Sequence, residues 1–282
     1  MNRVEQIFTT LRQERKRALM PFICGGHPHL GATAQILPAL QAAGASIVEV
    51  GIPFSDPIAD GPVIAAAMHV ALQRGSTPQS VLDEVRSVRD RLSIGLVAMV
   101  SVSIVHRMGG PAEFVAKAAD AGFDGFIFPD APLEESGVLL STCRERGVAA
   151  SLLISPSTPF SRAKEIVAAS SGFVYLLARA GITGERAEAP EIAGRVNKLR
   201  EVTELPIAVG FGISNAAHVQ SVTESADAAI VGSALVRRMS EADAAGRDPV
   251  AEASSFVGEL FQGLQARQTS AGQPAESGAS SP

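Results

Sequence analysis

Eight short runs of β-branched and other apolar residues alternate with longer segments of helical periodicity. The runs begin at residues 20, 45, 95, 124, 149, 173, 206 and 227, as in MPFICGG and GLVAMVS. Strands that alternate with helices predict a parallel sheet. Eight such units in about 250 residues fit a closed (β/α)₈ TIM barrel better than an open sheet. An open dinucleotide-binding sheet would carry a glycine fingerprint after its first strand, and GGHPHLG is not that fingerprint.

The barrel is predicted to occupy residues 1–267 as a single domain. Residues 1–14 are expected to form an additional amphipathic helix that covers the bottom of the barrel. Residues 249–266 have the pattern of the last outer helix. The C-terminal segment 268–282 consists mainly of small, polar and proline residues, so we expect it to be disordered.

Composition argues against several classes of partner. Hydrophobic residues make up 46% of the 282 residues, which is enough for a large core. The formal net charge is −5 and the basic residues are scattered, so we expect no nucleic acid partner. No apolar run approaches the roughly 20 residues of a membrane span and no signal peptide is evident, which predicts a cytoplasmic protein. Cys24 and Cys143 lack a metal-type spacing and are interpreted as core residues.

The second apolar run, ASIVEVG, contains a carboxylate at Glu49. A barrel strand is covered on both faces and is normally apolar throughout. By the two-residue period of a strand, Val48 and Val50 share one face and Glu49 lies on the other. If the valines face the helices, Glu49 points into the barrel near its C-terminal mouth, where catalytic residues of this fold lie. Burial would raise its pKa and suit proton transfer; the alternative is a structural ion pair with Arg or Lys.

A second carboxylate, Asp60, lies on the following loop beside Gly61 and Pro62. Because Pro62 favours a helix start, Asp60 is compatible with a helix N-cap. It is equally compatible with a functional carboxylate that faces Glu49 across the mouth of the barrel.

Three glycine-containing segments, AGITGER, GFGIS and GSALV, follow the last three apolar runs. In many barrels the loops after the seventh and eighth strands bind phosphate through backbone N–H groups. We therefore expect Gly212, Gly232 and Ser233 to contact a phosphate, and Gly184 to close over it. Two carboxylates and a phosphate site, without a cluster of metal ligands, suggest proton transfer on a phosphorylated small molecule. Aldolase-like cleavage, isomerisation and epimerisation remain open, although the strands carry no lysine for a Schiff-base aldolase.

Five motifs in order resemble the α subunit of tryptophan synthase: VEVGIPFSDPIADGP, FIFPDAPLEE, FVYLLARAGITG, VGFGIS and IVGSALV. The match runs from about Met20 to Val236. The resemblance implies a (β/α)₈ barrel that cleaves indole-3-glycerol phosphate, by a retro-aldol reaction, to indole and glyceraldehyde 3-phosphate. It also implies an α₂β₂ heterotetramer in which indole passes to a β subunit for tryptophan synthesis. No cofactor is expected in this chain, and pyridoxal phosphate is expected only in the β subunit.

The resemblance also implies roles for single residues. Glu49 resembles the family's acid/base, which protonates the indole ring carbon. Asp60 resembles the carboxylate that accepts a hydrogen bond from the indole N–H. Of the two, Glu49 is expected to lie in the drier environment. Thr183 resembles the mobile-loop residue that bonds to the Asp60 position when the site closes. Residues that resemble the indole pocket are Phe22, Ile127, Tyr175 and Phe211. Residues on loops that meet the β subunit in the family are Asp56, Pro57, Asp130 and Pro132.

The sequence departs from the family at the end of the run 95–101. The family usually has Tyr-x-Asn there, and this chain has Ser101 and Ser103. The smaller side chains predict an altered substrate fit or an altered coupling to the β subunit. Two other functions therefore compete with an α subunit that acts in a complex: a stand-alone lyase that releases indole, and a non-catalytic subunit that only activates its β partner. The retained carboxylates and glycine loops favour catalysis.

Overall fold

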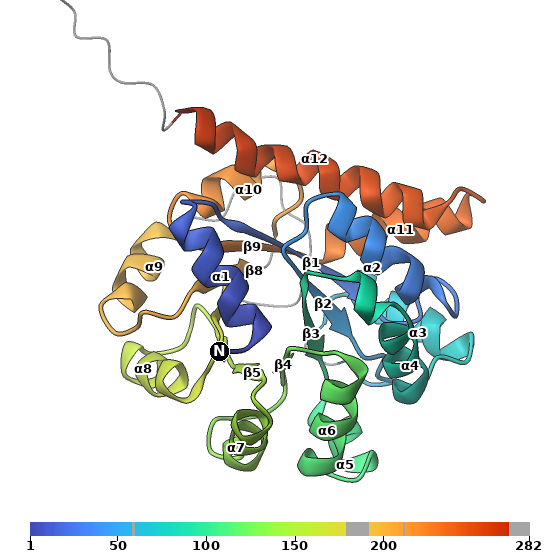
Figure 1. Cartoon of the computed structure of the whole chain (residues 1–282), viewed down its shortest axis with the longest axis horizontal. Coiled ribbons are helices and arrows are strands. Elements are labelled where there is room, and N and C mark those ends of the chain that lie inside the picture. The colour runs from blue at the N-terminus through green and yellow to red at the C-terminus, as the bar shows by residue number, and fades with distance from the viewer. Residues whose placement is uncertain (58–59, 179–191, 211, 271–282) are drawn as a thin grey trace, which may run out of the picture.

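The computed structural model describes residues 1–57, 60–178, 192–210 and 212–270. Its strands are β1 (Ala18–Cys24), β2 (Ile47–Gly51), β3 (Gly95–Met99), β4 (Gly125–Ile127), β5 (Ala149–Ser151), β6 (Leu153–Ile154), β7 (Val174–Leu177), β8 (Ile207–Gly210) and β9 (Ala228–Val231). Its α-helices are α1 (Arg3–Gln13), α2 (Ala32–Ala42), α3 (Pro62–Gln73), α4 (Pro78–Val88), α5 (Val102–Arg107), α6 (Pro111–Ala121), α7 (Gly137–Arg146), α8 (Phe160–Ala169), α9 (Ala193–Arg200), α10 (Ala216–Thr223), α11 (Ser233–Ala244) and α12 (Pro249–Ser270). The helices surround the strands (Figure 1).

Within the described residues, parallel strands form one sheet in the order β5-β4-β3-β2-β1-β9-β8-β7-β6. Its two edge strands, β5 and β6, are separated in the sequence by Leu152 alone. β5 pairs with β4, and β6 pairs with β7. The sheet therefore closes through the run 149–154, whose two halves pair with different neighbours. This closure confirms the predicted (β/α)₈ barrel.

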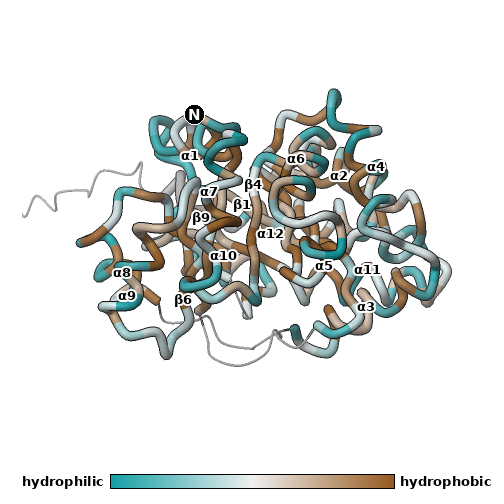
Figure 2. Tube along the Cα trace, turned by 90° about the horizontal axis from the view of Figure 1, so that it is seen from below, coloured by the Kyte–Doolittle hydropathy of each residue, from teal (hydrophilic) through white to brown (hydrophobic). Residues whose placement is uncertain are grey.

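Successive residues of each strand face the barrel interior and the helices in turn. Val48 and Val50 pack in the large cluster that includes residues of the surrounding helices. Ile47 packs instead with inward-facing residues such as Val97 and Ala208. All residues of β1 and β2 are buried. Figure 2 shows β1 among the hydrophobic segments of the chain. The predicted orientation of the valine face toward the helices is confirmed.

Helix α1 covers one end of the barrel, as the sequence predicted. Val4 and Phe8 are buried among the inward-facing side chains, and the ring centroids of Phe8 and Phe173 are 6.1 Å apart. Asn2 caps the helix: its side chain accepts from the Glu5 N–H at 2.9 Å, and the Glu5 carboxylate accepts from the Asn2 N–H at 3.1 Å. The opposite end, where the strands finish, is left to the loops that carry the candidate site.

Helix α12 lies across α10, α11 and α2, so the last helix of the chain packs against one of the first (Figure 1). It ends at Ser270 and therefore exceeds the predicted range 249–266. It also includes the first three residues of the segment 268–282 that was expected to be disordered. Of the four added residues, Arg267 and Gln268 are good helix formers, which favours continuation of the helix past residue 266. The rest of the segment lies outside the described residues.

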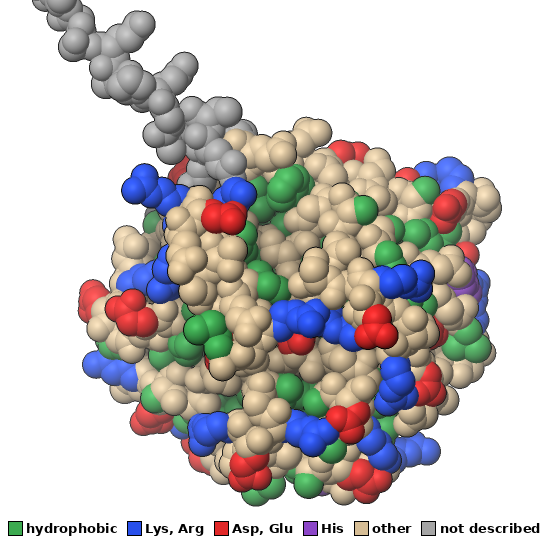
Figure 3. All heavy atoms as spheres, in the orientation of Figure 1, with side chains coloured by type: hydrophobic (Ala, Val, Ile, Leu, Met, Phe, Trp, Pro, Cys, Tyr) green, Lys and Arg blue, Asp and Glu red, His purple; other side chains and the backbone are tan. Residues whose placement is uncertain are grey.

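Charged side chains of both signs are interspersed on the face shown in Figure 3. Within the described part of the chain, no group of three or more His, Cys, Asp or Glu side chains is arranged to hold a metal ion. Among the helices that the structure describes, none is long and apolar enough to cross a membrane.

Candidate active site

Glu49 lies in the middle of β2 and faces the barrel interior. It pairs with Phe22 of β1 and Val97 of β3, and its exposed fraction is 0%. Neither carboxylate oxygen has a hydrogen-bond partner among the described residues, so the alternative of a structural ion pair is not observed there. Burial raises the pKa of Glu49 from 4.5 to about 8. The side chain is therefore a protonated acid at neutral pH, as its expected role requires.

Asp60 lies on the loop between β2 and α3, at the C-terminal end of the strands. Gly61 occupies the N-cap position of α3, so the N-cap interpretation of Asp60 is wrong. The Asp60 N–H donates to the Pro57 carbonyl at 3.0 Å. Burial raises the pKa of Asp60 from 3.8 to about 6, which is less than the pKa of the drier Glu49. The two carboxyl groups therefore differ in the predicted direction.

Two other titratable side chains lie close to these carboxyl groups. Tyr175 on β7 is 4% exposed, and burial together with the charges of Glu49 and Asp60 raises its pKa well above 10. Burial and the charge of Asp60 also raise the pKa of the Cys24 thiol. Cys24 was interpreted as a core residue, and it does pack with Phe22 and Met68. Its position at the end of β1 also places it beside the carboxylate.

Three of the residues predicted to line an indole pocket, Phe22, Ile127 and Tyr175, are described by the structure. All three are buried, with exposed fractions of 6%, 0% and 4%. Phe22 lies opposite Glu49, and a Cβ atom added to Gly51 would be 2.5 Å from the Phe22 Cζ atom. The Phe22 ring therefore reaches from β1 over the end of β2. The fourth predicted residue, Phe211, lies outside the described residues.

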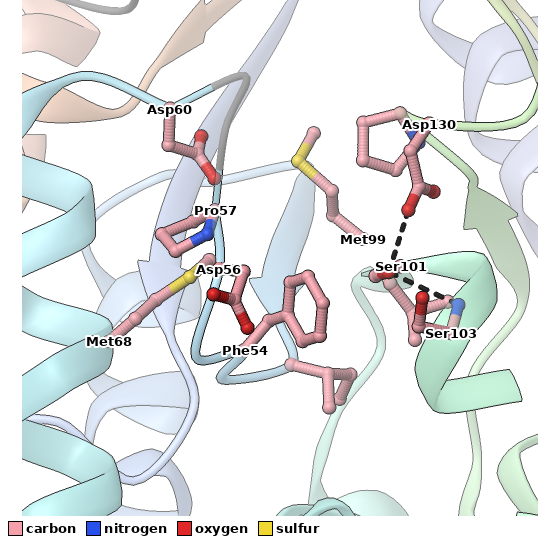
Figure 4. A pocket seen from close by; sticks show the side chains of 12 residues that line it. Phe54, Asp56, Pro57, Asp60, Met68, Met99, Ser101, Ser103 and Asp130 are labelled. Carbon is pink, nitrogen blue, oxygen red and sulfur yellow. Dashed lines mark hydrogen bonds between the residues drawn. The ribbon is translucent and has the colours of Figure 1, made fainter. Parts of the chain in front are cut away.

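A cavity of about 430 Å³ opens between the loops that follow β2, β3 and β4. Asp60 and Met68 line one side and Ser101 and Asp130 the other, with Phe54 and Met99 between them (Figure 4). Glu49 does not line this cavity. It lies one inward-facing position below Gly51, which pairs with Met99. The structure thus places Asp60 in the cavity wall and Glu49 beneath the cavity.

Sequence reasoning missed Met99 and Met68 as cavity residues. The two-residue strand period could have identified Met99, because Val97 and Met99 share the inner face of β3. Met68 comes from α3 and has no local sequence signal, since only the packing of this helix against β1 brings it to the cavity.

The predicted phosphate-binding residues lie on two loops at the same end of the barrel. Gly232 is the N-cap residue of α11 and Ser233 its first residue. The first N–H groups of a helix have no acceptor within it, so they are available to an anion. A Cβ atom on Gly232 would lie 3.6 Å from the Phe22 Cβ atom, so this helix start adjoins the predicted indole pocket. Gly212 follows β8 with a φ of 84°, which favours glycine.

Two further predicted residues, Thr183 and Gly184, lie outside the described residues. The predicted contact of Thr183 with Asp60 and that of Gly184 with the phosphate therefore stay predictions.

Known proteins resemble this chain over nearly its whole length. A family model described as "Tryptophan synthase alpha chain" matches residues 8–265. The tryptophan synthase alpha chain of Synechococcus sp. (strain CC9902) is 44% identical over 255 residues, which are 90% of this chain and 94% of the relative. That of Rhodopirellula baltica is 40% identical over 273 residues, which are 94% of this chain and 98% of the relative.

Solved structures give the same result. Tryptophan synthase subunit alpha from Legionella pneumophila str. Paris superposes with a TM-score of 0.87 at 31% identity and covers 94% of this chain and 99% of its own. A chain of tryptophan synthase from M. tuberculosis in its aminoacrylate-bound form superposes with a TM-score of 0.83 at 30% identity. The superposition covers 94% of this chain and 100% of the M. tuberculosis chain.

Proposed function

This chain belongs to the tryptophan synthase alpha chain family, and we propose that Glu49 and Asp60 are the catalytic pair of the family's reaction in it. That reaction is the retro-aldol cleavage of indole-3-glycerol phosphate to indole and glyceraldehyde 3-phosphate, so the chain is a lyase of tryptophan biosynthesis. The observation that carries the residue assignment is the contrast between the two carboxyl groups: Glu49 is fully buried, whereas Asp60 lines a cavity.

The raised pKa values support a division of labour between the two groups. Between about pH 6 and about pH 8, Glu49 holds a proton and Asp60 is ionised. Glu49 gives its proton to the indole ring carbon, and the Asp60 carboxylate accepts the indole N–H and offsets the positive charge that develops on the ring. As the carbon–carbon bond breaks, its electron pair returns to the ring. The Glu49 carboxylate then takes the proton of the adjacent glycerol hydroxyl, which becomes the aldehyde, and is restored to its acid form.

We further propose that the substrate phosphate binds at the start of α11 and at Gly212. Gly232→Val and Gly212→Val are expected to abolish binding of glycerol phosphate, because the added side chains occupy the space through which the phosphate reaches the N–H groups. Lys117→Ala is the control, since this exposed lysine pairs with Glu113 and binding is assigned to main-chain groups. Equilibrium titration measures all three variants. Unchanged affinity in both glycine variants would place the phosphate elsewhere.

We propose that a β subunit binds at the cavity end of the barrel and forms an α₂β₂ heterotetramer with this chain. Of the four residues that resemble the family's contact loops, Asp56, Asp130 and Pro132 are exposed and Pro57 is half-buried. They lie on the loops that surround the cavity, so indole could leave directly toward the partner. Pyridoxal phosphate is assigned to the β subunit, and both subunits to the cytoplasm.

Titration of the purified chain with its β subunit tests this proposal. We expect slow indole release by the isolated chain and a marked increase on titration, because a partner that holds Asp56 and Pro57 also fixes Asp60 on the same loop. Sedimentation of the mixture should show the complex. Full activity that does not change on titration would favour the stand-alone lyase. Stimulation of the β reaction without any indole release would favour the non-catalytic subunit.

A further inference from the structure

The loops after β3 and β4 are joined at the cavity by Ser101 and Asp130. The Ser101 hydroxyl donates to one Asp130 carboxylate oxygen at 2.6 Å, and the Val102 N–H donates to the other at 3.0 Å. A backbone bond from the Val100 N–H to the Ile127 carbonyl, 3.0 Å long, extends the pairing of β3 and β4 up to these side chains. Both oxygens of Asp130 are therefore held by the neighbouring loop.

The Ser101 hydroxyl oxygen makes a second hydrogen bond, in which it is the acceptor. It accepts from the Ser103 N–H at 3.2 Å, and Ser101 is thereby the N-cap residue of α5. The exposed fraction of Ser101 is 8%, whereas Asp130 is exposed. The pair thus connects a surface carboxylate to a buried hydroxyl in the cavity wall (Figure 4).

The wall that this pair holds stands across the cavity from Asp60. Met99, the last residue of β3, precedes Ser101 by two positions, and its side chain lies between the Asp60 side and the Asp130 side (Figure 4). Glu49 and Asp60 come from β2 and the loop after it, and they make no contact with the Ser101–Asp130 bond. Loss of this bond therefore frees the wall without removing either catalytic group.

We propose that Ser101 and Asp130 form a positioning pair that fixes the wall opposite Asp60 and so determines how tightly the indole portion of the substrate is held. This inference rests on the proposed function, because it places the indole beside Asp60. The pair shapes the wall and contacts no reacting atom, so it acts equally on the bound substrate and the transition state. Its loss raises KM and leaves kcat unchanged.

Steady-state cleavage of indole-3-glycerol phosphate tests the pair in Ser101→Ala, Asp130→Ala and the double variant. Because Asp130 also lies on a loop proposed to contact the β subunit, each variant is first titrated with β subunit and then measured at the concentration that saturates it. Because a hydrogen bond to a charged group is lost, we expect KM to rise about fivefold to tenfold in each single variant. The double variant is expected to show a smaller rise than the product of the two single rises, because both substitutions break the same Ser101–Asp130 bond. Rises that multiply in the double variant would overturn the proposal.

Two matched variants separate positioning from stability. Ser101→Thr keeps a hydroxyl and an N-cap oxygen, so its KM is expected to stay within about twofold of the wild type. Asn2→Ala removes the helix cap at the start of α1, at the opposite end of the barrel, and is expected to lower the melting temperature without raising KM. Unchanged KM in Ser101→Ala and Asp130→Ala, or a lower kcat at constant KM, would overturn the positioning role. Absence of cleavage by the wild-type complex would overturn the proposed function instead.

Discussion

Glu49→Gln is expected to abolish cleavage of indole-3-glycerol phosphate while the barrel remains folded. Glutamine keeps the shape of the side chain but can neither give nor take the proton. General acid/base groups are worth about 10²–10⁴ in rate, and in the proposed mechanism Glu49 acts on both the ring carbon and the hydroxyl, so we expect a loss of about 10⁴ or more. Indole release under single-turnover conditions measures it. Turnover near that of the wild type would end the assignment of Glu49.

The same variant tests the raised pKa of Glu49 through the pH dependence of the free energy of unfolding. Folded Glu49 keeps its proton up to about pH 8, whereas the unfolded chain loses it near pH 4.5. Above pH 4.5 the unfolded state therefore binds fewer protons, and the free energy of unfolding of the wild type falls as the pH rises to about 8. Glu49→Gln lacks this loss, so its stability relative to the wild type should grow by on the order of 1 kcal/mol per pH unit. Urea unfolding at several pH values measures this difference, and a constant difference would contradict the raised pKa.

Asp60→Asn is expected to lower kcat by about 10²-fold or more, because a neutral amide cannot offset the positive charge on the indole ring. Its pH profile should also change. In the wild type, we expect activity to fall below about pH 6 as Asp60 is protonated and above about pH 8 as Glu49 loses its proton. The variant has no carboxylate to protonate at position 60, so the acidic limb near pH 6 should disappear. kcat measured from pH 5 to pH 9 checks both effects.

Asp83→Asn is the matched control for Asp60→Asn, because Asp83 is an exposed aspartate on α4 that pairs only with Arg86 and Gln79 among the described residues. We expect it to keep the wild-type rate and pH profile. A loss of less than about tenfold in Asp60→Asn, or an acidic limb that persists, would contradict a catalytic role for Asp60.

The parts of this structure that could be predicted follow local rules. The two-residue period of a strand placed Glu49 inside the barrel, and the alternation of strands and helices gave the fold. The raised pKa of Glu49 followed from its position in a strand, whereas its drier environment relative to Asp60 was implied by the family resemblance. The cavity could not be predicted in the same way, because Met68 reaches it through the packing of a helix. Nor could the pairing of Ser101 with Asp130, since no local pattern connects residues of two loops.

Elements from the start and the end of the chain pack against each other, and this arrangement affects the chain while it is being synthesised. Strand β1 pairs with β9 as well as with β2, and α12 packs on α2, so the first elements of the barrel gain their full set of partners only when the last ones are made. A ribosome that adds about 5–20 residues per second needs roughly ten to forty seconds to pass from the end of β1 to β9. During that time the nascent chain presents an unpaired strand edge and an uncovered helix face. Protection by a chaperone is therefore most valuable before the final quarter of the chain has emerged.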